Sequence, residues 1–514
     1  MGGTFRQSMA WLHTWAGVVI GTLLFAIFWM GTLSVFDREI DRWMMPGTRL
    51  AASTQAFSLD RAAAVVGPLL PAGASQWRID LPTERVPAAR FSFRDSAGNP
   101  AVRWLDPARY ALIPDQETLA ATGFLFPFHY RLHLKWMDLG YWLVGFAGMA
   151  MLALLFSGVL IHRKIFAELF TFRPHRRLQR SSLDLHNLTG VMCLPFHFII
   201  TLSGLIVFVG LYFPQAHLAA YGAGKAAKAA YTAEASGRYT RPAAGAPGRL
   251  VSLDGLVDRA EREWGGGRVN FVRVWHPGDA DSYVELRRSY AQDLPMNLDQ
   301  IYFDAGSGAV LHRFAAAPVM GAQRLIAGLH LIQFEHWTLR WLYFLAGLSG
   351  CVMIATGFLF WIGARRVRHA QRGLAGVRVV EGLAIGAVTG IVIATLAFFA
   401  ANRLLPPGAS LAGQDRAGLE MAAFYLVWLV TFVHAGWRPA AAWREQAWAI
   451  AGLALLCVSL NAVTTGAPLL RPASPALRAV AGVDALLLGL ALLAALGARQ
   501  LGAAPRPTAP VARP

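Results

Sequence analysis

Residues 12–31 read LHTWAGVVIGTLLFAIFWMG, and residues 185–204 read LHNLTGVMCLPFHFIITLSG. In each stretch a Leu-His pair is followed by glycines four and eighteen residues after the histidine, namely Gly17 and Gly31 in the first and Gly190 and Gly204 in the second. A stretch of about 20 apolar residues is long enough to cross a bilayer as a helix. The chain therefore carries the same membrane helix twice, and this internal repeat organises the rest of the sequence.

The repeat continues beyond these two helices. The apolar helix that follows in each copy has a matching stretch, FSGVL at 156–160 and ATGFL at 355–359. The polar link between the two helices of each copy opens with Ser-Leu-Asp, at 58–60 and 252–254. Serine before an acidic residue is a typical helix start, and each link then has alternating, strand-like runs. The sequence predicts a unit of helix, small α+β domain and helix that is used twice in the same orientation, which is a parallel repeat.

The composition is typical of a membrane protein. Of the 514 residues, 55% are hydrophobic and only 15% are charged, which argues against disorder. The stretches that are apolar and long enough to span a bilayer lie at residues 12–36, 139–161, 187–211, 341–362, 379–400, 418–437, 446–464 and 479–498. We therefore predict a mainly α, polytopic membrane protein with about eight transmembrane helices and two small α+β outer domains in a tandem parallel repeat.

The formal net charge of +17 first suggests a nucleic-acid partner. However, Lys and Arg are concentrated in the links after the second, fourth and sixth spans and in the C-terminal tail, which all fall on one side of the membrane. The positive-inside rule makes this side the cytoplasm, so the N-terminus is cytoplasmic and the two long links lie outside. We expect a multi-pass protein of a bacterial-type inner membrane, in contact with lipid and without a nucleic-acid partner.

The expected domain boundaries follow from this topology. In chain order they are a first transmembrane helix at 1–36, a first outer domain at 37–138, a second transmembrane helix at 139–162, a cytoplasmic basic loop at 163–186, a third transmembrane helix at 187–211, a second outer domain at 212–340, a fourth transmembrane helix at 341–362, and a four-helix membrane extension with a tail at 363–514. The extension has no counterpart within the repeat.

Histidines gather at the ends of the predicted spans. His13 and His186 are equivalent positions at the cytoplasmic ends of spans one and three, while His133 and His330 precede spans two and four, each in a Leu-His pair. Two pairs of histidines at two depths are the arrangement that two bis-histidine b-type haems require. Zinc is the competing interpretation, but it needs three or four ligands at one depth. Ordinary interfacial or helix-packing roles are the other alternative.

Other side chains could complete these sites. The alternative haem ligands are His197, which lies within a span, His162 at the cytoplasmic edge, and His129 one helical turn before His133. The candidate partners of the haem propionates are Arg131, Arg340 and Arg163. These arginines could equally be ordinary anchors at the membrane interface. The only metal expected in either site is the haem iron.

At these residues the sequence resembles the PepSY-associated transmembrane family. The matching stretches are LDLHN at 183–187, LPFH at 194–197 and RWLYF at 340–344, and the resemblance extends over about residues 5–365. It implies PepSY-like periplasmic domains in an iron-regulated inner-membrane protein, and in some members two haems that reduce ferric siderophores. The haem-ligand role carries over to the four Leu-His positions, His13, His133, His186 and His330.

The preferred hypothesis is a di-haem oxidoreductase that passes electrons across the membrane to a ferric siderophore or another periplasmic acceptor. No cytoplasmic link is long enough for a flavin domain, so we expect the electron donor to be a separate protein or a membrane quinol. One alternative is a non-enzymatic sensor or regulator whose outer domains bind a peptide or protein. The other alternative is a transporter for iron or a siderophore, since parallel repeats also occur in transporters.

Overall fold

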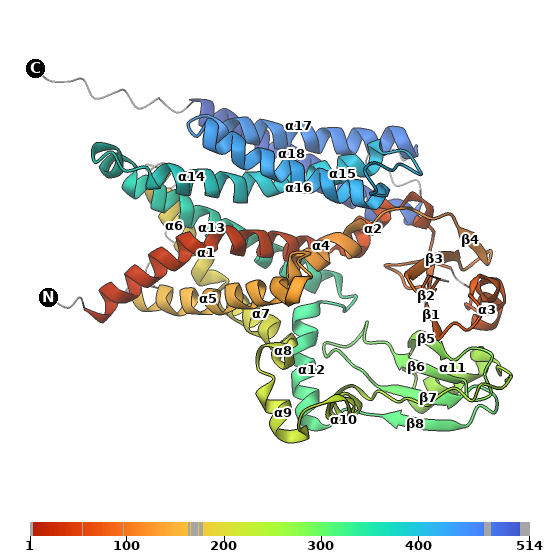
Figure 1. Cartoon of the computed structure of the whole chain (residues 1–514). Helices are drawn as coiled ribbons and strands as arrows, with labels where there is room; N and C mark the ends of the chain where they lie inside the picture. The colour runs from red at the N-terminus through yellow and green to blue at the C-terminus, as the bar shows by residue number, and fades with distance from the viewer. Residues whose placement is uncertain are drawn as a thin grey trace, which may run out of the picture. The chain divides into compact units, whose positions relative to one another are not determined.

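A computed structural model describes residues 4–53, 55–95, 97–162, 165, 173, 178–466 and 474–503 of the chain. The chain divides into two compact units, which are described separately (Figure 1). The helical unit consists of Met1–Met44, Glu117–Phe198 and Tyr343–Pro514. The sheet unit consists of Met45–Gln116 and Ile199–Leu342.

The helical unit is built from long apolar helices. The helices of the repeat that lie in it, wholly or in part, are α1 (Phe5–Ser34), α2 (Asp37–Met44), α4 (Ala120–Arg131), η3 (Trp136–Asp138), α5 (Leu139–Ile161), α6 (Leu178–Met192), α7 (Leu194–Val207) and α13 (Trp337–Gln371). The C-terminal helices are α14 (Gly376–Ile385), the π-helical turn η4 (Gly386–Gly390), α15 (Ile391–Leu404), α16 (Arg416–Trp437), α17 (Ala442–Thr465), η5 (Pro475–Leu477) and α18 (Arg478–Ala503). A capping box at Thr4 starts α1.

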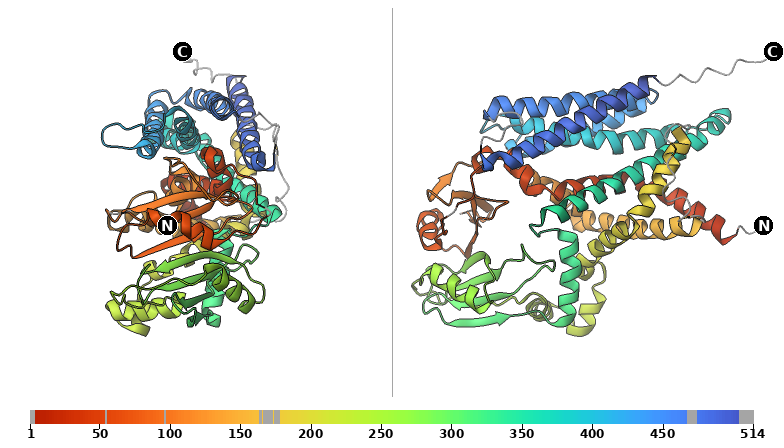
Figure 2. Two further views of the ribbon diagram at one scale, coloured as in Figure 1. Left: turned by 90° about the vertical axis from the view of Figure 1, so that its right-hand side faces the viewer. Right: turned by 180° about the vertical axis from the view of Figure 1, so that it is seen from behind.

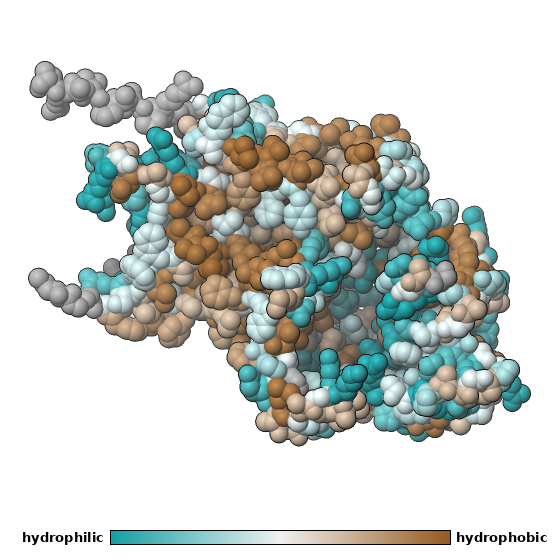
Figure 3. All heavy atoms as spheres, viewed as in Figure 1, coloured by the Kyte–Doolittle hydropathy of each residue, from teal (hydrophilic) through white to brown (hydrophobic). Residues whose placement is uncertain are grey.

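Seven helices of the described residues are long and apolar enough to cross a membrane, and an eighth candidate is a bent pair. This pair is Gln179–Met192 and Leu194–Val207, which meet at 65°. Pro195 lies at the break, where its missing N–H and its ring disfavour a continuous helix. Hydrophobic residues also cover the surface of the helices, which indicates contact with lipid (Figure 3). The prediction of a polytopic protein with about eight spans is confirmed.

Polar residues inside the last two spans pair with each other. Asn461 on α17 donates to a carboxylate oxygen of Asp484 on α18 at 3.2 Å, and the indole N–H of Trp43 donates to the same carboxylate at 2.7 Å. All three side chains are buried. An unpaired carboxylate at this position would be costly in an apolar environment. These hydrogen bonds therefore explain how two otherwise apolar helices accommodate Asn461 and Asp484.

The sheet unit contains one antiparallel sheet of eight strands in the order β4-β3-β2-β1-β5-β6-β7-β8. The strands are β1 (Gln76–Asp80), β2 (Ala89–Arg94), β3 (Pro100–Asp106), β4 (Ala111–Ile113), β5 (Val269–Trp275), β6 (Tyr283–Arg288), β7 (Gln300–Asp304) and β8 (Val310–Phe314). The other elements are η1 (Pro46–Thr48), α3 (Leu59–Val66), η2 (Gly67–Leu69), α8 (Val209–Tyr212), α9 (Gln215–Tyr221), α10 (Lys225–Ser236), α11 (Leu253–Glu263) and α12 (Pro318–Leu331). Helices α3 and α11 pack on one face of the sheet (Figure 2).

The two predicted outer domains each contribute four strands, and they join through β1 and β5. These two strands pair antiparallel, with Arg78 opposite Arg273 at the centre of the register. Each domain would otherwise leave the backbone hydrogen-bonding groups of an edge strand unpaired, and the pairing satisfies both edges. The α+β domains of the prediction are therefore confirmed, and they form one continuous sheet.

The helices on this sheet cap each other reciprocally. The hydroxyl of Ser58 and the backbone N–H of Leu59, at the start of α3, both donate to Asp254 at 2.6 Å. In the other copy, the hydroxyl of Ser252 and the N–H of Leu253, at the start of α11, donate to Asp60 at 2.6 and 2.7 Å. A carboxylate at a helix N-terminus satisfies free N–H groups and interacts favourably with the helix dipole. Each copy therefore supplies the acid that caps the other.

The reciprocal cap predicts a stability effect. Replacing Asp254 by Ala removes two hydrogen bonds at the start of α3 and should destabilise the sheet unit by about 1 kcal/mol, the usual cost of a lost helix cap. The midpoint of thermal unfolding of the purified protein would fall accordingly. The matched control is Asp258→Ala, since Asp258 is an exposed acid on the same helix. Equal midpoints for the two variants would contradict the capping role.

Candidate functional site

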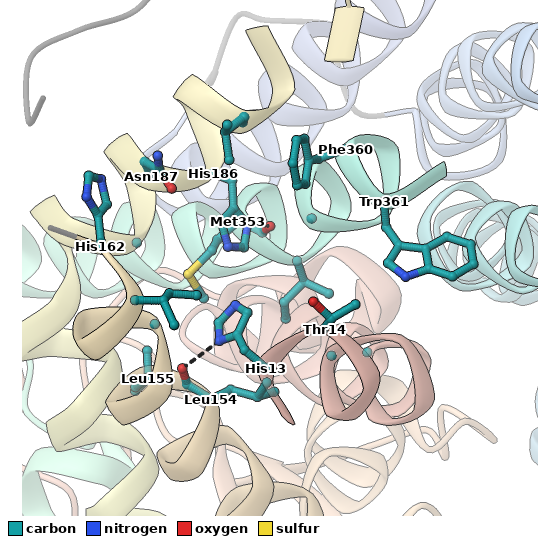
Figure 4. Close-up of a pocket in the computed structure, with 18 of the residues that line it drawn as sticks. His13, Thr14, Leu154, Leu155, His162, His186, Asn187, Met353, Phe360 and Trp361 are labelled. Carbon is teal, nitrogen blue, oxygen red and sulfur yellow. Dashed lines mark hydrogen bonds between the residues drawn. The ribbon is translucent and has the colours of Figure 1, made fainter. Parts of the chain in front are cut away.

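A cavity of about 650 Å³ lies in the helical unit among α1, α5, α6 and α13 (Figure 4). Its walls are mostly apolar, and glycines from all four helices line it: Gly17 and Gly21 from α1, Gly158 from α5, Gly190 from α6 and Gly357 from α13. Glycines leave room for a flat ligand face close to the helix backbone. The volume falls in the range of about 300–1,000 Å³ that is typical of small-molecule and cofactor sites.

Two histidines face each other in this cavity, as the repeat predicts. The ring centroids of His13 and His186 are 6.2 Å apart, and the ring planes are nearly perpendicular at 84°. The Nδ1–H of His13 donates to the carbonyl of Leu154 on α5 at 3.0 Å, and that of His186 donates to the carbonyl of Met353 on α13 at 2.8 Å. Within the described residues, no hydrogen bond reaches the Nε2 atom of either ring. The free Nε2 atoms are thus the ones that can bind a ligand.

A glycine makes each of these contacts possible. A Cβ atom on Gly158 would lie 3.2 Å from the His13 ring, and a Cβ atom on Gly357 would lie 3.3 Å from the His186 ring. These distances are shorter than ordinary van der Waals contact, so any larger residue would push the imidazole away. The carbonyl that accepts each histidine N–H belongs to the residue four positions before that glycine.

The same local geometry recurs at two more histidines. His129 on α4 donates through Nδ1 to the carbonyl of Ile27 at 2.8 Å, and a Cβ on Gly31 would lie 2.6 Å from its ring. His330 on α12 donates to the carbonyl of Ile200 at 2.8 Å, and a Cβ on Gly204 would lie 2.7 Å from its ring. Again the accepting carbonyl lies four residues before the glycine. His129 and His330 are therefore the structurally equivalent pair of the repeat.

His133 has a different environment from the other predicted ligands. Its Nε2–H donates to the carbonyl of Phe124 at 2.8 Å, and its Nδ1 accepts from the hydroxyl of Tyr425 on α16 at 2.9 Å. It also follows the left-handed residue Leu132 and has a positive φ of 56° itself, so it does not continue the face of α4 that carries His129. Because both ring nitrogens are used, this arrangement argues against His133 as an axial ligand.

The other alternative ligands lie at different depths of the helical unit. His162 follows the last residue of α5 and lines the cavity with His13 and His186. His197 on α7 is fully buried, with Nε2 at 3.2 Å from the hydroxyl of Ser349 and 3.4 Å from the carbonyl of Ala346. Ala346 lies four residues before Gly350, and a Cβ on Gly350 would lie 3.3 Å from the Nε2 atom of His197, so this ring also packs on a glycine turn, but through Nε2.

The arginines chosen from the sequence as propionate partners do not line the cavity. Arg340 is buried and donates to the carbonyl of Ile332 at 3.0 Å, which caps the end of α12, and Arg131 lies over the ring of Tyr130. Arg163 lies outside the described residues. The arginines that do line the cavity are Arg6 and Arg365. Sequence reasoning missed them as site residues, although both belong to the basic side that the positive-inside rule predicts to be cytoplasmic.

Residues 10–364 match the model of the PepSY-associated TM region. The chain belongs to this family. It is also 28% identical over 392 residues to an uncharacterised protein of Pseudomonas aeruginosa. This aligned region covers 72% of the chain and 92% of the relative.

The family match covers both copies of the PepSY-associated repeat and ends within α13. It therefore includes the four histidines whose Nδ1 bonds to the carbonyl four residues before a glycine. Helices α14 to α18 lie beyond it. This membership and the apolar helices establish a multi-pass membrane protein.

The environment of His133 predicts a pH effect on stability. Burial, with smaller contributions from Arg131 and Lys135, lowers the pKa of His133 from 6.5 to about 4 in the folded protein. A histidine with a depressed pKa stabilises the fold fully above pH 6.5, and this stability is lost as the pH falls towards 4. Between pH 7 and pH 5, the thermal midpoint of the wild type should therefore fall further than that of His133→Gln. Parallel pH dependences in the two proteins would contradict this role.

Proposed function

We propose that this protein is a b-type haem oxidoreductase that carries electrons across the inner membrane to a periplasmic ferric chelate, such as a ferric siderophore. The observation that carries the proposal is the pair of imidazoles, His13 and His186, which face each other at 6.2 Å in an apolar cavity. Both come from equivalent positions of the repeat. Each copy of the repeat would thus supply one imidazole to a shared metal.

The observed geometry fits a haem. Two imidazoles that share one iron through bonds of about 2 Å have ring centroids about 6 Å apart, which is the separation of His13 and His186. A histidine ligand also commonly donates its other N–H to a backbone carbonyl, as both rings do here. Zinc fits less well, because no group of three or more His, Cys, Asp or Glu that could hold a metal ion occurs among the described residues.

The residues of the cavity have separable roles in this proposal. The hydrogen bonds to Leu154 and Met353 fix the tautomer of each imidazole, so that Nε2 carries the lone pair. Arg6 and Arg365 line the same cavity and would pair with the carboxylates of the propionates. A haem bound in this way supplies reversible one-electron iron chemistry.

His129 in the helical unit and His330 in the sheet unit have equivalent local environments, which supports an axial-ligand role for each of these residues. In this proposal the axial ligand is His129, the alternative from the sequence, in place of the preferred His133. The glycine, the carbonyl four residues earlier and the Nδ1 hydrogen bond are all present at both positions. These are the features that leave Nε2 for a metal at His13 and His186.

The proposal includes a direction for electron flow. The arginine distribution supports a cytoplasmic N-terminus, so a donor on that side, either a quinol or a separate protein, gives up the electron. The acceptor on the other side is Fe(III) held by hard oxygen ligands. One-electron reduction to Fe(II) weakens its binding to those ligands and releases the metal.

The first test of the proposal is the visible spectrum. Protein purified from haem-replete cells should show a b-type Soret band and α-band changes on reduction with dithionite. His13→Ala and His186→Ala should each lose roughly half of the haem, the share of one of two bis-histidine sites. His434→Ala is the matched control, since His434 pairs with Glu445 on the C-terminal helices. A colourless wild-type protein would refute the proposal.

A second test changes a glycine and leaves every histidine in place. Gly357→Val should displace the His186 ring, because even a Cβ would lie 3.3 Å from it, and should thereby lower the haem content. Gly436→Ala on α16 is the control, since no atom lies within 4 Å of its Cβ position. The readout is the haem-to-protein ratio at matched thermal midpoints. An unchanged ratio in Gly357→Val would reject His186 as a ligand.

A further inference from the structure

The eight-stranded sheet has two chemically different faces. Side chains alternate between the faces of a strand with a period of two. The face that packs against α3 and α11 is apolar, with Ile79, Val272 and Leu286 in its core. The opposite face carries arginines on the four adjacent strands β2, β1, β5 and β6, and we call the cluster of Arg90, Arg78, Arg273 and Arg287 the arginine face.

Three of these arginines surround one aromatic ring. The guanidinium carbon of Arg78 lies 3.7 Å from the ring centroid of Phe271, and those of Arg287 and Arg273 lie at 5.0 and 5.2 Å. Arg78 and Arg273 are also direct cross-strand partners. Like charges directly opposite each other destabilise a sheet. The positive charges of these arginines therefore repel each other across the two strands.

The acids on this face only partly neutralise it. Asp80 accepts hydrogen bonds from Arg78 and Arg90, and Glu285 accepts from Arg273 and Arg287 at 3.2 Å each. The four arginines of the cluster thus share two carboxylates, while Asp304 of β7, on the same face, pairs with Arg241.

The guanidinium groups still have unused donors. The Nε atoms of Arg273 and Arg287 are buried and have no hydrogen-bond partner within the described part of the chain. The four side chains remain between 22% and 40% exposed, so a ligand can reach them. Burial lowers the pKa of Arg273, the charge of Glu285 opposes this shift, and the neighbouring charges of Arg78 and Arg287 add to it. An added anion would offset the repulsion among these arginines.

We infer that the arginine face binds an anionic ferric chelate, one whose iron is held by catecholate or carboxylate oxygens. Guanidinium groups bind such oxygens through paired, charge-assisted hydrogen bonds. The indole of Trp275 packs against the cluster, since Arg273 lies over its ring and its N–H donates to Glu285 at 3.1 Å. This inference rests on the proposed function in taking a ferric chelate as the ligand, and it adds the charge class of that chelate and the residues that recognise it.

The test uses gallium(III) chelates, which match ferric chelates in charge and shape but are not reduced. Binding can therefore be measured on the full-length protein whether or not electron transfer occurs. We expect an anionic gallium tris-catecholate to bind at least tenfold more tightly in calorimetry than an uncharged gallium tris-hydroxamate. Equal affinities for the two chelates, or no binding of the catecholate, would overturn the inference. Neither result would bear on the haem spectrum that tests the proposed function.

Variants locate the binding on this face. The double variant Arg78→Gln, Arg273→Gln should bind the gallium tris-catecholate at least tenfold more weakly. The salt dependence of this affinity should also become smaller. Arg273→Lys keeps the charge and should retain more affinity than Arg273→Gln. The control is Arg313→Gln, since Arg313 pairs with Glu263 elsewhere in the sheet unit. Wild-type affinity in the double variant, at an unchanged thermal midpoint, would overturn the site. Inorganic phosphate that binds as tightly as the catecholate chelate would also overturn it.

Discussion

The helical unit depends on one hydrogen bond that is made repeatedly, from a histidine Nδ1–H to a backbone carbonyl of a neighbouring helix. In an α-helix the carbonyl four residues before a glycine already accepts from that glycine's own N–H. A carbonyl oxygen has a second lone pair, and the histidine uses it. The glycine therefore matters in two ways. It has no side chain, which leaves space for the imidazole, and it lies in the same helical turn as the carbonyl that orients the imidazole. His13 and His186 are fixed in this way by backbone atoms of α5 and α13.

Much of this architecture could be predicted from the sequence because it depends on periodicity. Hydropathy identifies the spans, and the spacing of Leu-His and glycine identifies the repeat. The pair His13 and His186 follows from the equivalence of the two copies. Two small outer domains were also predictable, but their fusion into one sheet was not. That fusion depends on the unpaired edges of β1 and β5, which carry no signature in the composition of either strand.

The choice between His129 and His133 shows where sequence reasoning stops. The two residues are four apart, so on a continuous helix they would share a face. Helix α4 instead ends at Arg131 and the chain turns through the left-handed Leu132, which separates them. Only the structure shows this break. A signal was nevertheless present, since Gly31 and Gly204 hold equivalent positions in the repeat, and each is the glycine against which one of the two outer histidines packs.

The reciprocal caps at Ser58 and Ser252 have a consequence for a single copy of the repeat. Each copy of the repeat supplies the acid that the other copy lacks at its helix start, and each supplies one imidazole of the facing pair. A single copy carries one such acid and one such imidazole, so it could complete both arrangements only by associating with a second copy in a symmetric pair.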